Sequence, residues 1–213
     1  MDSVAIVGNG PSLLKHEFGA DIDSHDVIVR IKDGYIRKDL HSLSLGKRGH
    51  IICRSNRSHG GPIENYKRWI FVDSRDPLDK DKGLKFGGDV ICDTSLCRIW
   101  VERYCALREA YDPAPNQKRH GLFSDKFGHQ HPSAGSFSIL YAMDKLSPDV
   151  LRLYGFENVI SGTHTWSLTR GEGHPGYPDH NWPAEKRLLE AMCKHYGYNY
   201  SLSEGVACLS KQA

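Results

Sequence analysis

Short runs of β-branched and other apolar residues recur along the chain and predict buried strands. Each run is three to five residues long and is bounded by glycine or polar residues, as is typical of strands inside a sheet. Continuous apolar runs of this length favour strands covered on both faces. The predicted strands are Val4–Val7, Val27–Ile31, Ile51–Cys53, Trp69–Val72, Val90–Cys92 and Val150–Tyr154.

Apolar residues at three- and four-residue spacing predict helices over Thr94–Tyr111, Ser133–Leu146 and Pro183–Tyr196. The third stretch has a proline at its start and Gly197 after its end, which are typical helix boundaries. Strands that alternate with helices predict an α/β fold, a mainly parallel sheet flanked by helices, in a single domain over residues 1–213. In such sheets ligands bind outside the carboxyl ends of the strands.

Composition narrows the class of protein. The chain has 213 residues, 28 Lys and Arg against 26 Asp and Glu, and a net charge of +2. This balance argues against a disordered chain and against a strongly basic nucleic-acid-binding protein. No apolar run is long enough to span a bilayer and no leader pattern is present, so we expect no membrane contact. Six cysteines without a Cys-x-x-Cys pair favour free thiols in a reducing compartment, and we expect a cytoplasmic protein.

A glycine-rich turn, Val7-Gly8-Asn9-Gly10-Pro11-Ser12, follows the first predicted strand directly. Glycines let the backbone turn tightly and approach a phosphate or ribose. An ordinary strand-to-helix turn would also explain them. The third glycine of the dinucleotide fingerprint is missing, since Leu13 follows Ser12, so an NAD or FAD site is disfavoured.

The turn continues into a longer pattern. An acidic turn, Asp21-Ile22-Asp23-Ser24-His25-Asp26, precedes the strand Val27–Ile31, which contains an arginine. The whole span Val4–Lys32 resembles the long sialyl motif of the animal-type sialyltransferases.

Three further segments resemble that family's other motifs, in the same order along the chain. The short motif is matched by Pro132-Ser133-Ala134-Gly135 with Tyr154-Gly155-Phe156, the third motif by His164-Thr165-Trp166, and the very short motif by His180 and Glu185. The segment Ser55–Gly128 has no match.

The resemblance implies a Rossmann-like variant of the glycosyltransferase A-type fold and an inverting, metal-independent transfer. The sugar would move from a nucleotide-sugar donor, with CMP-sialic acid favoured, to an acceptor hydroxyl. His180 would be the general base, and His164 would contact the departing phosphate. Histidine suits both roles because its pKa lies near working pH.

The resemblance also implies a donor-nucleotide site. Its residues would be Gly8, Asn9, Gly10, Ser12, Lys32, Ser133, Ala134, Gly135 and Trp166. Tyr154 would support the site by packing, and Glu185 would orient the His180 region or cap a helix. His25 would stabilise its own turn. No cofactor is expected beyond the nucleotide sugar itself, which is a substrate.

No metal site is predicted. Asp21-x-Asp23 and Asp79-x-Asp81 satisfy a pattern that metal-dependent glycosyltransferases use, but the first belongs to the acidic turn and the second to a charged loop. The pair His129-x-His131 alone specifies no site.

Some positions depart from the family. The two cysteines that the family joins fall at Val4 and near Leu146, which fits a protein folding in a reducing compartment. Lys32 stands where the motif has asparagine, and Ala134 where it has threonine, so the donor stays open. A soluble, disulfide-free form would suit a bacterial or viral source.

Basic residues are frequent between Arg37 and His59. This segment can be interpreted in two ways, which imply different acceptors. A solvated basic face is slightly preferred, and the acceptor would then be a glycan. A surface that tracks phosphates would instead suit transfer of a non-sialic sugar to a hydroxymethylated base in DNA. A non-catalytic nucleotide-binding module is a further alternative. The oligomeric state is open.

Overall fold

The structure is a computed structural model of the 213-residue chain. It describes residues 1–31, 46–54, 68–71, 89–91, 99, 103, 133–161 and 182–212.

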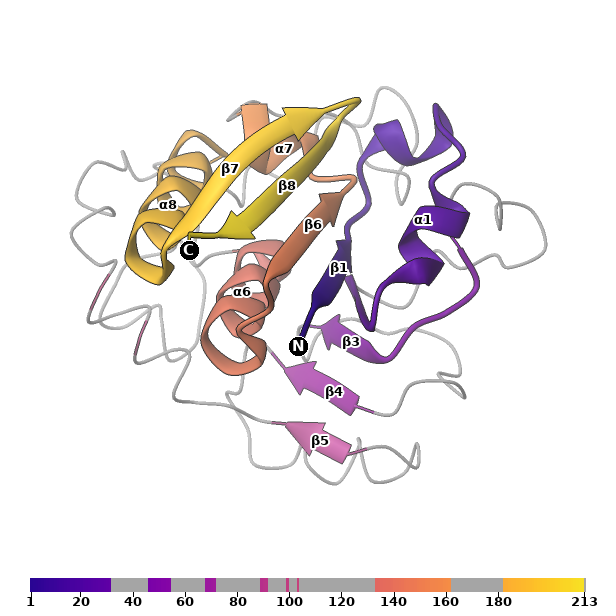
Figure 1. Cartoon of the computed structure of the whole chain (residues 1–213), viewed down its shortest axis with the longest axis horizontal. Coiled ribbons are helices and arrows are strands. Elements are labelled where there is room, and N and C mark those ends of the chain that lie inside the picture. Colours follow the sequence, from indigo (N-terminus) through magenta and orange to yellow (C-terminus); the bar gives the residue numbers. More distant parts are fainter. Residues whose placement is uncertain are drawn as a thin grey trace, which may run out of the picture.

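The described strands form one sheet in the order β5-β4-β3-β2-β1-β6-β8-β7 (Figure 1). Neighbouring strands from β5 to β6 are parallel, whereas β8 and β7 are antiparallel additions beside β6. The predicted mainly parallel α/β fold is therefore confirmed. The strands are β1 (Ser3–Val7), β2 (Val27–Ile31), β3 (Ile51–Arg54), β4 (Arg68–Phe71), β5 (Asp89–Ile91), β6 (Val150–Tyr154), β7 (Tyr198–Ser203) and β8 (Val206–Lys211).

Six helical segments are described: η1 (Pro11–Leu14), α1 (Gly19–Ser24), α6 (Ala134–Tyr141), η2 (Ala142–Leu146), α7 (Glu157–Ser161) and α8 (Trp182–Tyr196). The predicted helix over Ser133–Leu146 is α6 with a π-helical continuation, η2. Helix α8 carries Pro183 in its first turn and is followed by Gly197 at φ 71°, as the sequence predicted. The predicted helix Thr94–Tyr111 lies outside the described residues, apart from Ile99 and Arg103.

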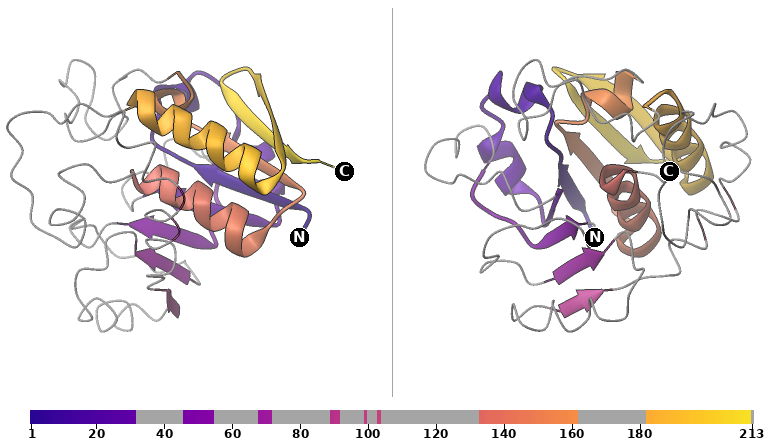
Figure 2. Two further views of the ribbon diagram at one scale, coloured as in Figure 1. Left: turned by 90° about the vertical axis from the view of Figure 1, so that its left-hand side faces the viewer. Right: turned by 180° about the vertical axis from the view of Figure 1, so that it is seen from behind.

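The two faces of the sheet carry different helices. Along β1, Val4 and Ile6 enter an apolar cluster with α6 and α8, whereas Ala5 and Val7 pack with α1 residues on the other face. Helices α6 and α8 lie side by side in both views of Figure 2. Because β1 is buried on both faces, its apolar run is continuous rather than alternating.

The hairpin of β7 and β8 was not predicted. Its two-residue turn, Glu204-Gly205, has φ values of 50° and 79°, as a tight hairpin between twisted strands requires. The alternation of aromatic or aliphatic residues with Asn and Ser in Tyr198–Ser203 is a weak strand signal beside the continuous runs of the core.

The two positions where the resembling family has cysteines meet the same apolar cluster here. Val4 is fully buried in it, and Leu146 packs against it. The cysteines of the described residues, Cys53, Cys193 and Cys208, are free thiols. Burial raises the pKa of the Cys53 thiol to about 12. None of the described helices has the length and apolar character needed to cross a bilayer.

Candidate functional site

The glycine turn after β1 is joined directly to the end of β6. The backbone N–H of Gly8 donates to the carbonyl of Tyr154 at 2.8 Å, and that of Gly10 donates to Gly155 at 2.9 Å. The chain builds the sheet from β1 towards β5 and then returns to place β6 on the other side of β1. The turn therefore lies at the point where strand order reverses, which is the usual ligand crevice of open α/β sheets.

Both glycines are required by this close approach. A Cβ at Gly8 would lie 2.5 Å from the Gly155 oxygen, and a Cβ at Gly10 would collide with the Glu157 carboxylate. Gly155 has φ 69° and contacts Leu13, so it too is restricted to glycine. Packing thus explains these glycines without a ligand, and their role in donor binding stays a prediction.

Phe156 connects the glycine turn to the start of α6. A Cβ at Gly8 would lie 3.1 Å from its ring, and a Cβ at Gly135 would lie 2.9 Å from the opposite side of that ring. Segments from the predicted long and short motifs therefore share one buried aromatic side chain. Ala134, next to Gly135, accepts a hydrogen bond from the Cys53 thiol at the end of β3.

Ser133 begins α6 and is held by Glu185 from the first turn of α8. The carboxylate accepts from the Ser133 N–H at 2.9 Å and from the Ser133 hydroxyl at 2.6 Å, and it also accepts from the Ser136 hydroxyl. The Ser133 hydroxyl in turn accepts from the Ser136 N–H and caps the helix. Burial raises the pKa of Glu185 despite these three donors. Glu185 therefore holds Ser133, the N-cap residue of α6, and is not itself the cap of that helix. Its expected role in orienting the His180 region stays a prediction.

Two polar atoms beneath the glycine turn have no hydrogen-bond partner among the described residues. The Glu157 carboxylate accepts from the Ser12 N–H through Oε1 at 2.6 Å, while its Oε2 and the Ser12 hydroxyl are buried without hydrogen bonds. Buried polar atoms without a hydrogen-bond partner are uncommon in native structures. Asn9 lies beside them in sequence and donates weakly, at 3.5 Å, to the Ile31 carbonyl. Glu157 was not foreseen, and its only sequence signal is its place after Tyr-Gly-Phe.

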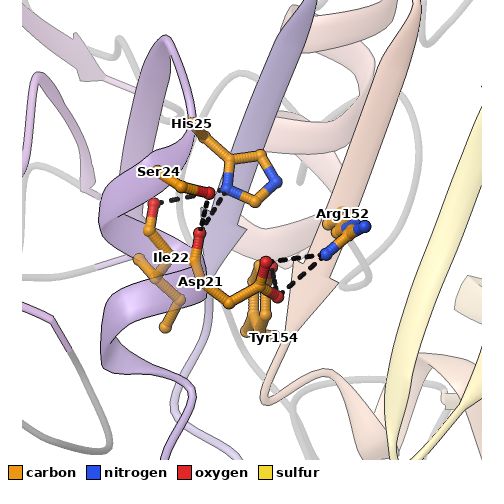
Figure 3. A network of polar contacts seen from close by, with 6 residues as sticks. All are labelled: Asp21, Ile22, Ser24, His25, Arg152 and Tyr154. Carbon is orange, nitrogen blue, oxygen red and sulfur yellow. Dashed lines mark hydrogen bonds and ion pairs between the residues drawn. The ribbon is translucent and has the colours of Figure 1, made fainter.

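The acidic turn is engaged in protein contacts, which Figure 3 shows for Asp21 and His25. Asp21 accepts from Arg152 at 2.8 and 2.9 Å and from the Tyr154 hydroxyl at 2.6 Å. The pKa of Tyr154 is raised, chiefly by burial. The His25 ring lies 2.8 Å from the Asp21 carbonyl and stacks edge-on against Tyr154, which fits the structural role expected for it.

Asp23 is occupied by a different segment. Its carboxylate accepts from the backbone N–H groups of Lys47 and Arg48 at 2.7 and 2.9 Å. Since Asp21 faces Arg152 and Asp23 faces this backbone, the two carboxylates serve separate partners and do not converge as a ligand pair. The Arg48 side chain also donates to the Asp23 carbonyl and contacts His50, whose Nδ1 accepts from Ile28 at 3.0 Å.

The structure gathers part of the predicted site. Around the carboxyl ends of β1 and β6 it brings together Gly8, Asn9, Gly10, Ser12, Ser133, Ala134, Gly135, Tyr154 and Glu185. Tyr154 is fully buried and packs, as foreseen. His164, His180, Lys32 and Trp166 lie outside the described residues, as do Asp79-x-Asp81, His129-x-His131 and most of Arg37–His59.

Known proteins show the same resemblance. Residues 1–59 match the family model described as Glycosyltransferase family 29 (sialyltransferase). Among solved structures, the chain is similar to a mammalian sialyltransferase, with a TM-score of 0.57 and 15% identity over 91% of this chain. It is also similar to a mammalian sialyltransferase in complex with Gal-beta-1-3GalNAc-ortho-nitrophenol, with a TM-score of 0.56 and 15% identity over the same share. The chain spans 66% of the length of each of these structures. No curated protein matches it in sequence.

These likenesses concern the fold of the chain and, separately, its first 59 residues. Its fold is that of the sialyltransferases, with the glycine turn at the reversal point of the sheet. Its first 59 residues match the model of glycosyltransferase family 29, which confirms the resemblance expected from the long motif.

Proposed function

We propose that the protein is an inverting glycosyltransferase that moves a sugar from a nucleotide-sugar donor to an acceptor hydroxyl, with CMP-sialic acid as the favoured donor. One observation carries the proposal. Two segments far apart in sequence, the turn Gly8–Gly10 and the helix start Ser133–Gly135, meet around Phe156 at the ligand edge of the sheet. The family match of residues 1–59 supports the same class.

The donor nucleotide is proposed to occupy this edge. Its binding would use the partly exposed Asn9 amide, the α6 start and the unpartnered atoms of Ser12 and Glu157. The Ser133–Glu185 contacts keep the α6 start in place whether or not a ligand is bound. This arrangement fits a preformed site more than one assembled by the ligand.

The chemistry is proposed for two histidines on grounds of sequence. His180 would take the proton from the acceptor hydroxyl, whose oxygen attacks the anomeric carbon as the bond to the donor phosphate breaks. His164 would stabilise the phosphate, which leaves with the bonding electrons. In the sequence His180 comes two residues before Trp182, the first residue of α8.

A glycan is the proposed acceptor. Of the basic segment Arg37–His59, the described Arg48 and His50 side chains make contacts within the protein. No described contact favours a DNA acceptor.

The donor is tested by thermal unfolding with CMP, UDP, GDP and their sugars. A ligand that binds only the folded state raises stability by about 2.7 kcal/mol at a hundred times its Kd. We expect a shift with CMP and CMP-sialic acid that is absent with the other nucleotides. A shift with UDP or GDP alone would refute CMP-sialic acid as the donor. The absence of a shift with every nucleotide would refute the proposed nucleotide site.

The variant Ser12→Ala separates binding from stability. The Ser12 hydroxyl has no hydrogen-bond partner in the described part of the chain, so the melting temperature without ligand should be unchanged while the nucleotide-induced shift is reduced. Ser210→Ala removes an exposed hydroxyl from β8, outside the glycine turn, and is the matched control.

Catalysis is tested with His180→Ala. We expect loss of transfer with an unchanged melting temperature and an unchanged nucleotide shift. The exposed His195 near the end of α8 provides the control His195→Ala, which should keep full activity. Near-normal transfer by folded His180→Ala would refute the assignment of the base.

A further inference from the structure

The strand β7 forms an open edge of the sheet that lacks the usual protection against pairing. Its sequence, Tyr-Asn-Tyr-Ser-Leu-Ser, contains no charged residue and no proline. Native edge strands commonly carry lysine, proline or a bulge, which prevent another strand from adding to them. Two large apolar side chains on this strand are exposed, Tyr200 at 44% and Leu202 at 54%.

Alternate residues of β7 hydrogen-bond to β8, and this alternation determines which backbone groups face the open edge. Ser203 pairs with Val206 across the two-residue turn, and Gln212 donates from its N–H to the Gly197 carbonyl at 2.7 Å. Because bonded and non-bonded pairs alternate in an antiparallel ladder, the odd-numbered residues from 197 to 203 bond to β8. The backbone groups of Tyr200 and Leu202 therefore point outward, and no partner for them is found within the described part of the chain.

We infer that β7 is a dimerisation edge, on which β7 of a second copy of this chain pairs antiparallel about a two-fold axis at Ser201. In this register Tyr200 of each copy lies opposite Leu202 of the other. Both residues have outward backbone groups, so each such pair exchanges two hydrogen bonds. The same register forms two aromatic–aliphatic cross-strand pairs on one face of the sheet.

Charge favours a second copy over an unrelated strand. The tip of the hairpin carries the exposed Glu204, whereas Lys211 lies opposite Tyr198 at its base, and Lys194 and His195 stand in the last turn of α8. Antiparallel self-pairing brings the acidic tip of each copy to the basic base of the other. The residues of β7 itself carry no charge, so the paired strands place no like charges of their own opposite each other.

The oligomeric state tests the inference directly. Sedimentation of the full chain at rising concentration should show a species of twice the 24.0 kDa monomer mass. Leu202→Lys, at an exposed position, should shift the protein to monomer with its melting temperature retained. Ser210→Lys is the matched control, because it adds the same charge to β8 of the same hairpin, away from the edge, and should leave the dimer intact.

Cysteine pairing tests the register. Ser201→Cys should form a disulfide between copies, because the two-fold axis places this residue opposite itself. The background is Cys208→Ser, since Cys208 lies across from Ser201 within the hairpin. Ser203→Cys should not link, because it lies about 14 Å from its symmetry mate in this register. A chain that stays monomeric at every concentration overturns the inference, as does a dimer that persists in Leu202→Lys or fails to link through Ser201→Cys.

Discussion

The carboxylates of Asp21 and Glu185 lie on opposite faces of the sheet, and each joins segments that are far apart in the chain. Asp21 connects α1 to β6 through Arg152 and Tyr154, and its side chain is 43% exposed. Glu185 connects α8 to the start of α6 and is 2% exposed. The exposed carboxylate pairs with a cation, where water screens the interaction, whereas the buried one is surrounded by N–H and O–H donors. The comparison indicates that the start of α6 is held by buried hydrogen bonds, whereas α1 is held by a contact that is partly exposed to water.

The largest effect is expected from Glu185→Ala. The substitution leaves the Ser133 N–H and two hydroxyls buried without their acceptor, and unsatisfied groups of this kind cost about 1–3 kcal/mol each. We expect the free energy of unfolding in urea to fall by about 3 kcal/mol or more. The exposed Glu190 on the same helix gives the control Glu190→Ala, with a change within about 0.5 kcal/mol. Equal stability of the two variants would show that the buried network contributes nothing.

The next largest effect is expected in the pH dependence of the free energy of unfolding. Burial raises the folded-state pKa of Glu185 above its ordinary value near 4.5. A raised pKa means that its contribution to stability is fully present below the unfolded-state pKa and is lost as pH rises through the folded-state pKa. The free energy of unfolding of the wild type, relative to Glu185→Gln, should therefore decrease from about pH 4 upward and then level off. A flat difference would contradict the raised pKa.

Asp21→Asn should cost about 1 kcal/mol, because the pair with Arg152 is half exposed while the amide oxygen still accepts from Tyr154. Urea unfolding measures this change. Asp21→Ala should cost more, since it leaves the buried Tyr154 hydroxyl without its acceptor. If the two variants were equally stable, the Tyr154 hydrogen bond would be unimportant.

The smallest effect is a salt dependence. Raising ionic strength screens exposed charges, so the Asp21–Arg152 pair should weaken by a few tenths of a kcal/mol. The wild type should lose this amount relative to Asp21→Asn in high salt. The cost of Glu185→Ala should not change with salt, because its network is buried. A salt effect of equal size on both carboxylates would remove the contrast between them.

The core strands and α8 could be predicted from sequence because their signals are local. Val4–Val7 and Val150–Tyr154 are continuous apolar runs, and Pro183 and Gly197 mark the helix ends. The motifs also placed Ser133 and Gly8 at one site. Neither the contact of Glu185 with Ser133 nor the position of Glu157 under Gly10 could be predicted, because each joins residues that are far apart in the sequence. The hairpin was missed because its polar alternation is stabilised by pairing with β6, which single-sequence patterns do not report.

The contact between Ser12 and Glu157 joins residues 145 positions apart. The partners of the first strand are therefore completed only late in the synthesis of the chain. A nascent chain that has emerged only as far as β5 has one side of β1 unpaired, since β6 has not yet been made. The central strand of the sheet, apolar on both faces, is then an open edge for most of the time that translation takes. Chaperone binding to arrested nascent chains should therefore fall sharply only once the residues of β6 have left the ribosome.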